Sequence, residues 1–523
     1  MGTVYLVGAG PWDEGLLTLR GAALLARAGA VLYDALANPA LLRHAPAGAE
    51  RTFVGRRGGR AGPPLEEVCE LLVAAAARHE VVVRLKGGDP FLFGRGGEEA
   101  LALHAAGVPF EVVPGVSSAV AAAAYAGVPL THRGLASSVV YATGRTGDEG
   151  DAPDFEALGR LGGTLVLFMG ITGFGPIAAA LLRGGRAPET PVAFVRWGTR
   201  ADQETVIARL GDWAGAAAGA PAPLRPPAIA IVGEVVALHA QLDWFAARPL
   251  SGRRVVITRA ELAAATPDPL EQILRDAGAD IVPFPTIETL PPDSWEPCDR
   301  ALAALESYDW VLFTSPRAVA ALLDRLDARG RDLRAFGRAR LAAVGDATAD
   351  ALRARGLRAD AVPSDARAEG LLAALGDQVR GARVFLPRAA QGRDVLPDGL
   401  RAAGAAAVDV APVYRTVPAH GDAAPVRAAL GAGTIDAVTF TSGSTVGAFC
   451  DLIDAAPGGA PGLAVRLCAG TRVAVIGAVT RRAAEERGLR VDVQPPHASI
   501  PALAHALVAA LAAAARPGLK GPP

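Results

Sequence analysis

The sequence is poor in the residues on which several classes of protein depend. Its 523 residues include only four cysteines and two methionines, and aromatic residues make up 5% of the chain. The cysteines are far apart, with no C-x-x-C pair and no histidine neighbours, so the pattern predicts neither a disulfide framework nor a metal site. They are Cys69, Cys298, Cys450 and Cys468.

A surplus of charge of either sign is also missing. Lys and Arg total 52 and Asp and Glu 53, which leaves a net charge of −1 and no large basic field for nucleic acid or acidic lipid. The longest alanine-rich run, AVAAAAYAGVPL, is shorter than the roughly 18 residues that a membrane span needs. The chain opens on the strand-like run MGTVYLVGAGP, without a charged leader. We therefore expect a soluble cytoplasmic protein with no nucleic-acid or membrane partner.

Short strand-like runs alternate with longer helical patterns along almost the whole chain. Examples are TVYLVGAG, then LLTLRGAALLARAG, then AVLYDAL. Such alternation is typical of α/β folds with mostly parallel sheets. At about 150 residues per domain, the length predicts roughly three or four compact units. The run RPLSGRR predicts a short linker at 248–251, and ARPGLKGPP predicts a tail at 513–523.

The second half of the chain contains an internal duplication. GRRVVITRA (252–260) recurs as GARVFLPRA (381–389), and DWVLFTSPRAVAALLDRL (309–326) recurs as DAVTFTSGSTVGAFCDLI (436–453). A third pair follows in the same order, in which ARLAAVGDATADAL matches TRVAVIGAVTRRAA. We therefore expect two copies of one α/β unit that face each other across a cleft.

The stretch LKGGDPFLFGRGGEE (85–99) places many glycines directly after the apolar run VVVRL. Glycine-rich turns after a strand often hold phosphate, but this one lacks the G-K-[ST] pattern. Its Asp89, Glu98 and Glu99 would repel phosphate. A carboxylate beside free backbone amides and carbonyls suits a zwitterion with a cationic centre. S-adenosylmethionine, which carries a sulfonium, an amino acid and a ribose, has that chemistry.

A set of motifs in the first half resembles, in order and spacing, uroporphyrinogen-III C-methyltransferase over residues 3 to about 246. They are VGAGPWDEGLLTLRG, VLYDALANP, RLKGGDPFLFGRGGEE, FEVVPGVSS, AGVPLTHRG, TLVLFMG and PVAFVRWGT. The resemblance implies a two-lobed methylase, with lobes of about 1–115 and 116–247 and the cofactor between them. It implies that S-adenosylmethionine contacts Pro11, Gly87, Gly88, Asp89, Leu92, Ser117, Ser118, Met169 and Gly198.

The resemblance also assigns the proton chemistry. It makes Asp34 the base that takes a proton from the macrocycle after methylation, although the sequence without the resemblance favours a turn cap. Arg56 stands where the family has lysine, so either a proton-donor role is dispensable or Arg56 clamps a substrate carboxylate, which we favour. Arg95 and Arg133 are further candidates for binding the substrate, against the common case of a solvated surface arginine. Trp12, where the family usually has glycine, predicts a reshaped entrance.

After residue 252 no nucleophile–base pair, metal cluster or phosphate loop stands out. Instead, Ser or Thr follows strands just before helices, as in FTSPRAV and FTSGSTV, where hydroxyl groups cap helices or bind carboxylates. The order and duplication of these motifs resemble uroporphyrinogen-III synthase over residues 250 to about 512. That family folds as two α/β domains, which on this chain would be 252–286 with 417–512, and 287–416.

The synthase resemblance implies cyclisation of hydroxymethylbilane without a metal. Tyr414, in VYRT, matches a tyrosine that assists loss of the substrate hydroxyl in that family. The binding candidates are Thr314, Ser442 and Thr480.

Together the two resemblances imply a bifunctional enzyme that makes uroporphyrinogen III and methylates it at C2 and C7 to precorrin-2. We expect small tetrapyrrole substrates, S-adenosylmethionine as the cofactor, and a homodimer formed through the methylase half. Two alternatives stay open. The first half could methylate a later corrin intermediate, or the C-terminal half could be a ligand-binding regulatory module.

Overall fold

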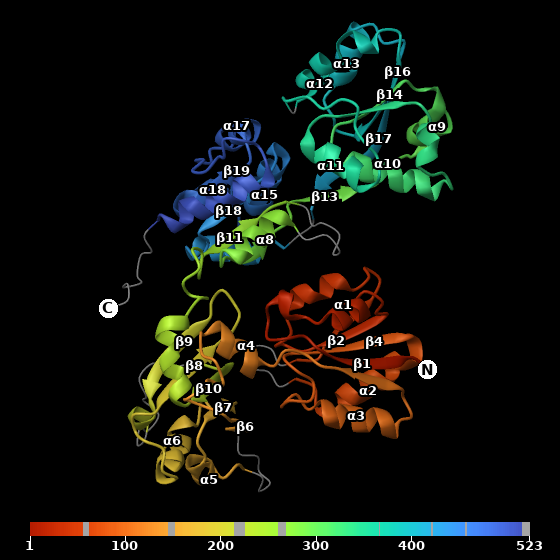
Figure 1. The fold of residues 1–523 in the computed structure, drawn as a ribbon. Helices are drawn as coiled ribbons and strands as arrows, with labels where there is room; N and C mark the ends of the chain where they lie inside the picture. The colour runs from red at the N-terminus through yellow and green to blue at the C-terminus, as the bar shows by residue number, and fades with distance from the viewer. Residues whose placement is uncertain are drawn as a thin grey trace.

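The computed structural model describes residues 1–55, 62–144, 152–213, 225–259, 268–365, 367–419, 422–455 and 458–514. Over these residues the chain forms four β-sheets flanked by helices, two in each half of the chain (Figure 1). The predicted α/β class is therefore confirmed.

The first sheet is wholly parallel, with the strand order β3-β2-β4-β1-β5. Its strands are β1 (Thr3–Gly8), β2 (Ala30–Tyr33), β3 (Glu50–Phe53), β4 (Val81–Lys86) and β5 (Phe110–Val113). Its helices are η1 (Glu14–Leu16), α1 (Leu19–Leu25), η2 (Pro39–His44), α2 (Leu65–Arg78) and α3 (Gly96–Ala105). Residues of α2 and α3 pack on one face and those of α1 and η2 on the other, which is why β4 reads as a near-continuous apolar run.

The second sheet is mixed, with the order β6-β7-β10-β8-β9, because β10 runs antiparallel to both of its neighbours. Its strands are β6 (Val139–Thr143), β7 (Thr164–Phe168), β8 (Pro191–Arg196), β9 (Glu204–Arg209) and β10 (Ala228–Val232). The helices around it are α4 (Ser118–Tyr125), α5 (Phe155–Arg160), α6 (Phe174–Arg183), η3 (Leu210–Trp213), η4 (Glu234–Leu238) and α7 (His239–Leu242). Phe174, Phe194 and Trp213 pack together in one of its cores, with the ring of Phe174 edge-on to the other two.

The third sheet, with the order β12-β11-β18-β19, combines strands that are far apart in the sequence. Its strands are β11 (Arg254–Ile257), β12 (Asp280–Pro283), β18 (Ala437–Phe440) and β19 (Arg472–Val475). The helices of this part are α8 (Pro269–Asp276), α14 (Ala424–Gly431), α15 (Gly443–Ala455), α16 (Leu463–Leu467), η8 (Cys468–Gly470), α17 (Ala478–Glu486) and α18 (Ile500–Ala512).

The fourth sheet, with the order β13-β17-β16-β14-β15, uses the chain between β12 and α14. Its strands are β13 (Ile287–Leu290), β14 (Trp310–Phe313), β15 (Arg340–Ala343), β16 (Arg383–Ala389) and β17 (Ala407–Pro418). Its helices are α9 (Glu296–Ala303), η5 (Leu305–Ser307), α10 (Pro316–Ala328), η6 (Leu333–Phe336), α11 (Asp346–Ala354), α12 (Ala368–Leu375), η7 (Gly376–Val379) and α13 (Val395–Ala402). The antiparallel pair β13 and β17 leads into the third-sheet region (Figure 1).

The internal duplication is visible in the strand orders of the last two sheets. By the repeated sequences, β11 corresponds to β16, β18 to β14, and β19 to β15. The corresponding strands occupy the same positions in the orders β12-β11-β18-β19 and β17-β16-β14-β15. Even the isolated parallel bridges correspond, since Ala342 pairs with Ala361 and Ala474 with Val493. The two sheets are therefore copies of one α/β unit.

Ion pairs join the two halves of the chain where α8 meets η1 and η2. Glu14 lies 2.8 Å from Arg43 and 3.4 Å from Arg275, and Arg43 lies 3.5 Å from Glu271. Glu14 is largely buried in this cluster. The first strand–helix segment of the second half is thus held against the first lobe.

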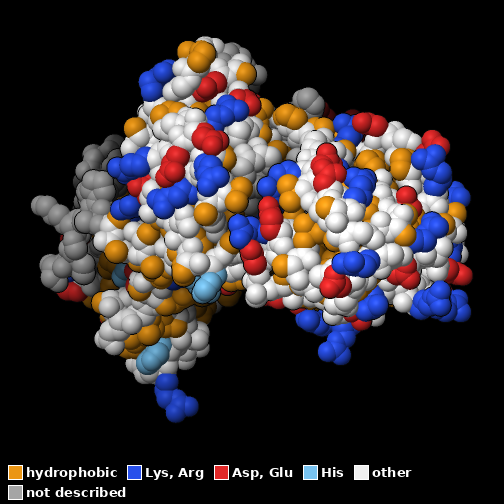
Figure 2. Space-filling view, turned by 90° about the horizontal axis from the view of Figure 1, so that it is seen from above, with side chains coloured by type: hydrophobic (Ala, Val, Ile, Leu, Met, Phe, Trp, Pro, Cys, Tyr) orange, Lys and Arg blue, Asp and Glu red, His pale blue; other side chains and the backbone are white. Residues whose placement is uncertain are grey.

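The surface carries mixed charge. Figure 2 shows Lys and Arg side chains interspersed with Asp and Glu over the face seen from above, as the near-zero net charge leads one to expect. Across the described ranges, no helix is long and apolar enough to cross a lipid bilayer.

Three glycines bring backbones into direct contact at the carboxyl ends of β1, β4 and β5. A Cβ atom on Gly8 would lie 2.5 Å from the Gly115 Cα atom, and one on Gly115 would lie 2.3 Å from the Gly88 carbonyl oxygen. The Gly88 N–H also donates to the Gly10 carbonyl at 2.8 Å. Backbone packing therefore explains part of the glycine content that the sequence suggested was reserved for a ligand.

We expect Gly115→Ala to destabilise the protein by about 1–3 kcal/mol, because the added methyl group meets backbone atoms that no side-chain rotation can move. Urea unfolding of the full chain, followed by tryptophan fluorescence, measures the change. Gly97→Ala, on α3, is the matched control, since its Cβ atom meets nothing within 4 Å. If Gly115→Ala were as stable as the wild type, the close approach of the Gly115 backbone to Gly8 and Gly88 would be wrong.

Candidate functional site

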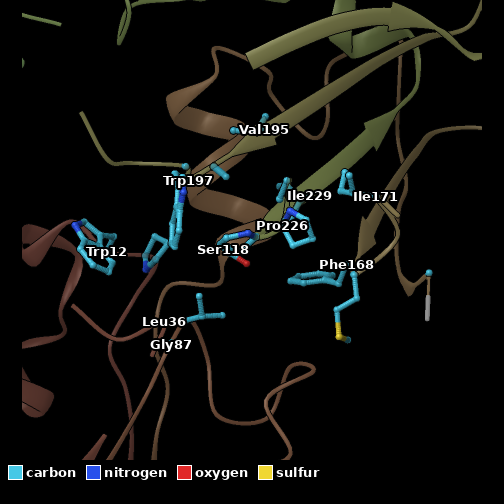
Figure 3. A pocket seen from close by; sticks show the side chains of 18 of the residues that line it. Trp12, Leu36, Gly87, Ser118, Phe168, Ile171, Val195, Trp197, Pro226 and Ile229 are labelled. Carbon is cyan, nitrogen blue, oxygen red and sulfur yellow. The ribbon is translucent and has the colours of Figure 1, made fainter. Parts of the chain in front are cut away.

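A cavity of about 760 Å³ lies between the first two lobes (Figure 3). The first lobe contributes the loops that follow β1, β2 and β4. The second lobe contributes the start of α4, the end of β7, the turn after β8 and the segment that leads into β10. The lining residues include Pro11, Trp12, Leu36, Gly87, Gly88, Ser118, Phe168, Met169, Trp197, Gly198, Pro226 and Ile229.

Six of the nine residues predicted to contact the cofactor line this one cavity. They come from five separate stretches of the chain, and they are Pro11, Gly87, Gly88, Ser118, Met169 and Gly198. The other three, Asp89, Leu92 and Ser117, do not line it. Ser117 caps α4, where its hydroxyl accepts from the Ala119 N–H at 3.3 Å.

Asp89 holds its own loop. One carboxylate oxygen accepts from the Phe91 N–H at 2.8 Å, and the other accepts from the Gly115 N–H at 3.0 Å. The side chain therefore ties the loop after β4 to the loop after β5, directly beside Gly88. A contact between Asp89 and a cofactor stays a prediction.

The cavity wall is neutral. Among the described residues, no Asp, Glu, Lys or Arg lines it, and its polar side chains are those of Ser118 and Thr172, with the indoles of Trp12 and Trp197 and the glycine backbone beside them. A pyrophosphate would find no cation there, whereas a largely apolar pocket with a few polar groups suits a small organic ligand. The volume falls within the usual range of about 300–1,000 Å³ for such sites.

Trp12 closes one end of the cavity. Its indole lies 6.1 Å from that of Trp197, and the Arg200 guanidinium stacks on both rings, at 4.4 and 4.2 Å from their centroids. A second cavity, of about 70 Å³, begins on the far side of Trp12 and reaches Arg275 in the second half of the chain. Trp12 thus separates the large cavity from the junction between the halves of the chain. The sequence predicted that this tryptophan, in place of the usual glycine, reshapes the entrance.

Exposed apolar side chains surround the open end of the cavity. Met169 and Leu36 are 52% and 51% exposed, and Phe93, 40% exposed, comes from the loop after β4. The Phe93 ring lies 4.7 Å from that of Phe168 on β7, so the two lobes touch through aromatic contact at the mouth. A large ligand with an apolar face would cover these groups.

Asp34 follows β2, and its carboxylate accepts from Arg84 Nη2 at 2.7 Å. Asp34 is partly exposed, whereas Arg84 is buried. The side chain makes this ion pair rather than the turn cap considered from the sequence. Leu36, two residues further on, lines the cavity, so Asp34 lies next to the site.

Of the predicted arginines, the two that the structure describes, Arg95 and Arg133, do not line the cavity. Arg56 lies outside the described residues. Arg95 begins α3 with φ 58° and pairs outward with Glu98, and Arg133 is exposed in the loop after Leu130. Their roles in binding the substrate stay predictions.

Sequence reasoning missed the buried charges beneath the glycine loop. Arg84, Lys86 and Glu99 form ion pairs with side chains that are 2–4% exposed. The signal was present, since VVVRLK places two cations in an otherwise apolar central strand, where uncompensated charge is rare.

In the second half, Tyr414 on β17 meets α10. Its hydroxyl lies 3.1 Å from the Ser315 hydroxyl, which caps α10. Next to it, Arg317 Nη1 donates to Thr289 on β13 at 2.7 Å, and burial lowers the pKa of the Arg317 guanidinium. Tyr414, Ser315 and Arg317 therefore meet at the β13–β17 connection. The sequence indicated Tyr414 and, within FTSPRAV, the helix cap Ser315, but not Arg317.

The three binding candidates lie in different settings. Thr314 is half-buried at the end of β14, and Ser442 contacts Ser444 and Thr445 at the start of α15. Thr480 is 4% exposed within α17. The described residues contain no group of three His, Cys, Asp or Glu side chains that could hold a metal ion, and the four cysteines are free thiols.

Comparison with known proteins matches both halves. Residues 3–214 match the family of tetrapyrrole (corrin/porphyrin) methylases, and residues 268–505 match uroporphyrinogen-III synthase HemD. The porphyrin biosynthesis protein HemD of Ruminiclostridium josui is 36% identical over 450 residues, which cover 86% of this chain and 88% of that protein. The uroporphyrinogen-III C-methyltransferase of Bacillus subtilis is 37% identical over 367 residues, or 70% and 74% of the two chains.

A solved structure matches the first half. Uroporphyrin-III C-methyl transferase from Thermus thermophilus, complexed with S-adenyl homocysteine, is 45% identical, with a TM-score of 0.40, and the match covers 45% of this chain and all of that one. Siroheme synthases match over only about half of their length, 53% for that of Sodalis glossinidius.

A two-lobed α/β methylase, followed by a duplicated α/β unit, is the class that the fold and the cavity define. The chain belongs to the tetrapyrrole methylases of the uroporphyrinogen-III C-methyltransferase type, joined to a uroporphyrinogen-III synthase. It is a bifunctional enzyme of tetrapyrrole biosynthesis, and the sequence-based prediction of both activities is confirmed.

Substitutions at Trp12 test the strained wall of the cavity. Trp12 has φ 117°, a conformation that glycine adopts without strain. Trp12→Gly and Trp12→Ala both lose the stacking on Arg200, but only alanine keeps the strain, so we expect the glycine variant to be about 1–3 kcal/mol more stable than the alanine variant. Thermal and urea unfolding measure the difference. Equal stabilities, or a more stable alanine variant, would contradict the backbone conformation described here.

Proposed function

We propose that the second half of this chain cyclises hydroxymethylbilane to uroporphyrinogen III and that the first half methylates this product at C2 and C7 with S-adenosylmethionine, to give precorrin-2. One observation carries the methylase part. Six predicted cofactor contacts from five stretches of sequence line a single cavity between two lobes.

The cavity fits S-adenosylmethionine by its chemistry. Pro226, Ile229 and Phe168 offer apolar surface for an adenine ring, while Ser118 and the backbone of Gly87 and Gly88 offer hydrogen-bonding groups for the polar part. Bound there, this cofactor would supply a methyl group on a sulfonium centre. A neutral wall neither repels that centre nor pairs with it, so the residues of the cavity would contribute chiefly by orientation.

The macrocycle would cover the apolar mouth. Phe93, Met169 and Leu36 expose apolar surface from both lobes around the opening, and a tetrapyrrole laid on them would shield the cavity from water. Asp34 lies at this side of the site, and as a carboxylate it would accept the proton that the methylated macrocycle releases. Arg84 holds the Asp34 carboxylate in one orientation.

Two related expectations complete the proposal. The resemblance to the methylase family supports a homodimer through the first half, and four unpaired thiols support a reducing, cytoplasmic location. The strand membership of the last two sheets supports a division of the second half into 252–286 with 417–512, and 287–416.

The purified chain, supplied with uroporphyrinogen III and S-adenosylmethionine, should yield a product heavier by two CH2 units, since each methyl group replaces a proton that the macrocycle releases, together with S-adenosylhomocysteine. Mass spectrometry and NMR of the product identify the sites of methylation. Transfer to a later corrin intermediate but not to uroporphyrinogen III would replace this proposal with the alternative methylase.

Tyr414→Phe should lower the cyclase rate at least tenfold, and by about 10²–10⁴-fold if the hydroxyl transfers a proton in the slow step. Tyr308→Phe is the matched control, because its hydroxyl is also hydrogen-bonded, to Asp409 at 2.6 Å, but it lies away from the β13–β17 connection. Separation of the type I and type III isomers measures the enzymatic product. Full formation of type III by Tyr414→Phe would remove Tyr414 from the chemistry.

A further inference from the structure

Four charged side chains form a chain beneath the glycine loop. Lys86 Nζ donates to Glu99 Oε1 at 2.8 Å, and Arg84 Nε donates to the same oxygen at 3.1 Å. Arg84 Nη2 then donates to Asp34 Oδ1 at 2.7 Å. Glu99 and Lys86 are thus linked to the proposed base through one guanidinium.

The fold dictates this arrangement. Arg84 and Lys86 are two residues apart on β4, so they project from the same face of the sheet, toward α3, which carries Glu99. β2 runs parallel to β4 with Leu32 opposite Arg84, and the Asp34 N–H donates to the Leu85 carbonyl at 3.3 Å. The base candidate therefore emerges beside Lys86 at the end of the neighbouring strand.

Burying these charged side chains costs free energy, so the cluster calls for a functional explanation. The side chains of Arg84, Lys86 and Glu99 are 4%, 3% and 2% exposed, and a buried ion pair is often no more stabilising than well-packed apolar residues. The second carboxylate oxygen of Glu99 is buried and has no hydrogen-bond partner among the described residues. Stability alone does not account for these four charges.

The lysine is also exceptional in this chain. Of 52 basic residues only two are lysines, Lys86 and Lys520, so the chain uses arginine almost everywhere else. A guanidinium stays charged and needs room for a planar fork, whereas an ammonium is compact and can lose its proton. Burial, followed by the neighbouring Arg84, lowers the pKa of Lys86.

We propose that Glu99 and Lys86 are positioning residues for methyl transfer, which act through Arg84 to set the charge that the Asp34 carboxylate experiences. The negative charge of Glu99 offsets part of the positive charge that Arg84 presents to Asp34. The positive charge of Lys86 in turn offsets part of the negative charge of Glu99. This arrangement keeps the Asp34 carboxylate oriented by Arg84 toward the proton that it would accept. The inference rests on the proposed role of Asp34 as the base.

Other titratable groups near the cluster lie on α2 and α3, where Glu98 interacts with Lys86. Cys69 interacts with Glu99, Arg84 and Lys86, and burial followed by Glu99 raises the pKa of its thiol. Glu66 interacts with Cys69 from the same helix. Arg56 follows Gly55, whose backbone approaches Ala35, but Arg56 itself lies outside the described residues.

The test is the pH dependence of the rate at which the full chain forms the methylated and deprotonated product in a single turnover, at saturating uroporphyrinogen III and S-adenosylmethionine. The rate should rise as Asp34 loses its proton. Glu99→Gln removes a negative charge, which favours the ionised form of Asp34, so the midpoint of the rise should move to lower pH. Lys86→Met removes a positive charge, so the midpoint should move to higher pH. Each shift should be roughly one pH unit, as expected for a unit charge several ångströms away.

Three further variants make the outcomes distinct. Glu98→Gln changes the same charge one residue away, on an exposed side chain paired with Arg95, and should move the midpoint much less than Glu99→Gln does, because water screens the exposed charge. The double variant Glu99→Gln/Lys86→Met removes both charges and should return the midpoint toward that of the wild type, even if either single variant folds poorly. Asp34→Asn should abolish the rise.

The failure of each idea gives a different result. Unshifted or equally shifted midpoints for Glu99→Gln and Lys86→Met, with the rise lost in Asp34→Asn, would overturn this inference and leave the proposed base intact. A normal rise in Asp34→Asn would instead overturn the proposed base.

Discussion

Direct contact between backbones at the carboxyl ends of β1, β4 and β5 is the constraint on which the methylase half depends. Gly8 and Gly115 leave no room for a Cβ atom beside each other and the Gly88 backbone, and Asp89 ties the loops after β4 and β5 together through two backbone N–H groups. The packed loops form one wall of the cavity, and the second lobe supplies the other. Glycine in this stretch therefore serves first to allow close packing of the loops, and the cavity lies beside the packed loops.

Much of this was predictable from the sequence, for identifiable physical reasons. Alternating short apolar runs and amphipathic segments predicted the α/β class. The repeated FTS motifs predicted the duplicated sheets, and they lie at the ends of the corresponding strands β14 and β18. Among the site residues, Gly87, Ser118 and Met169 were assigned through motifs, and they meet in space. The motif at 85–99 could not reveal that Asp89 points into its own loop, because that depends on the position of Gly115, 26 residues away.

Contacts between distant elements lay beyond the sequence. The Arg200 stack depends on two tryptophans that are far apart in the chain, and Ser315 reaches Tyr414 only because β17 lies beside α10. The ion pair of Asp34 with Arg84 depends on the pairing of β2 with β4. In each case the sequence shows the type of residue but not the side chain that it contacts in the folded protein.

The central claim is that one chain both closes the macrocycle and methylates it. The most direct measurement supplies the purified chain with hydroxymethylbilane and S-adenosylmethionine labelled with ¹³C in its methyl group, and follows the product by NMR. The account predicts a type III macrocycle that carries two labelled methyl groups, at C2 and C7. A product of the type I series, or a type III macrocycle without label, would contradict it.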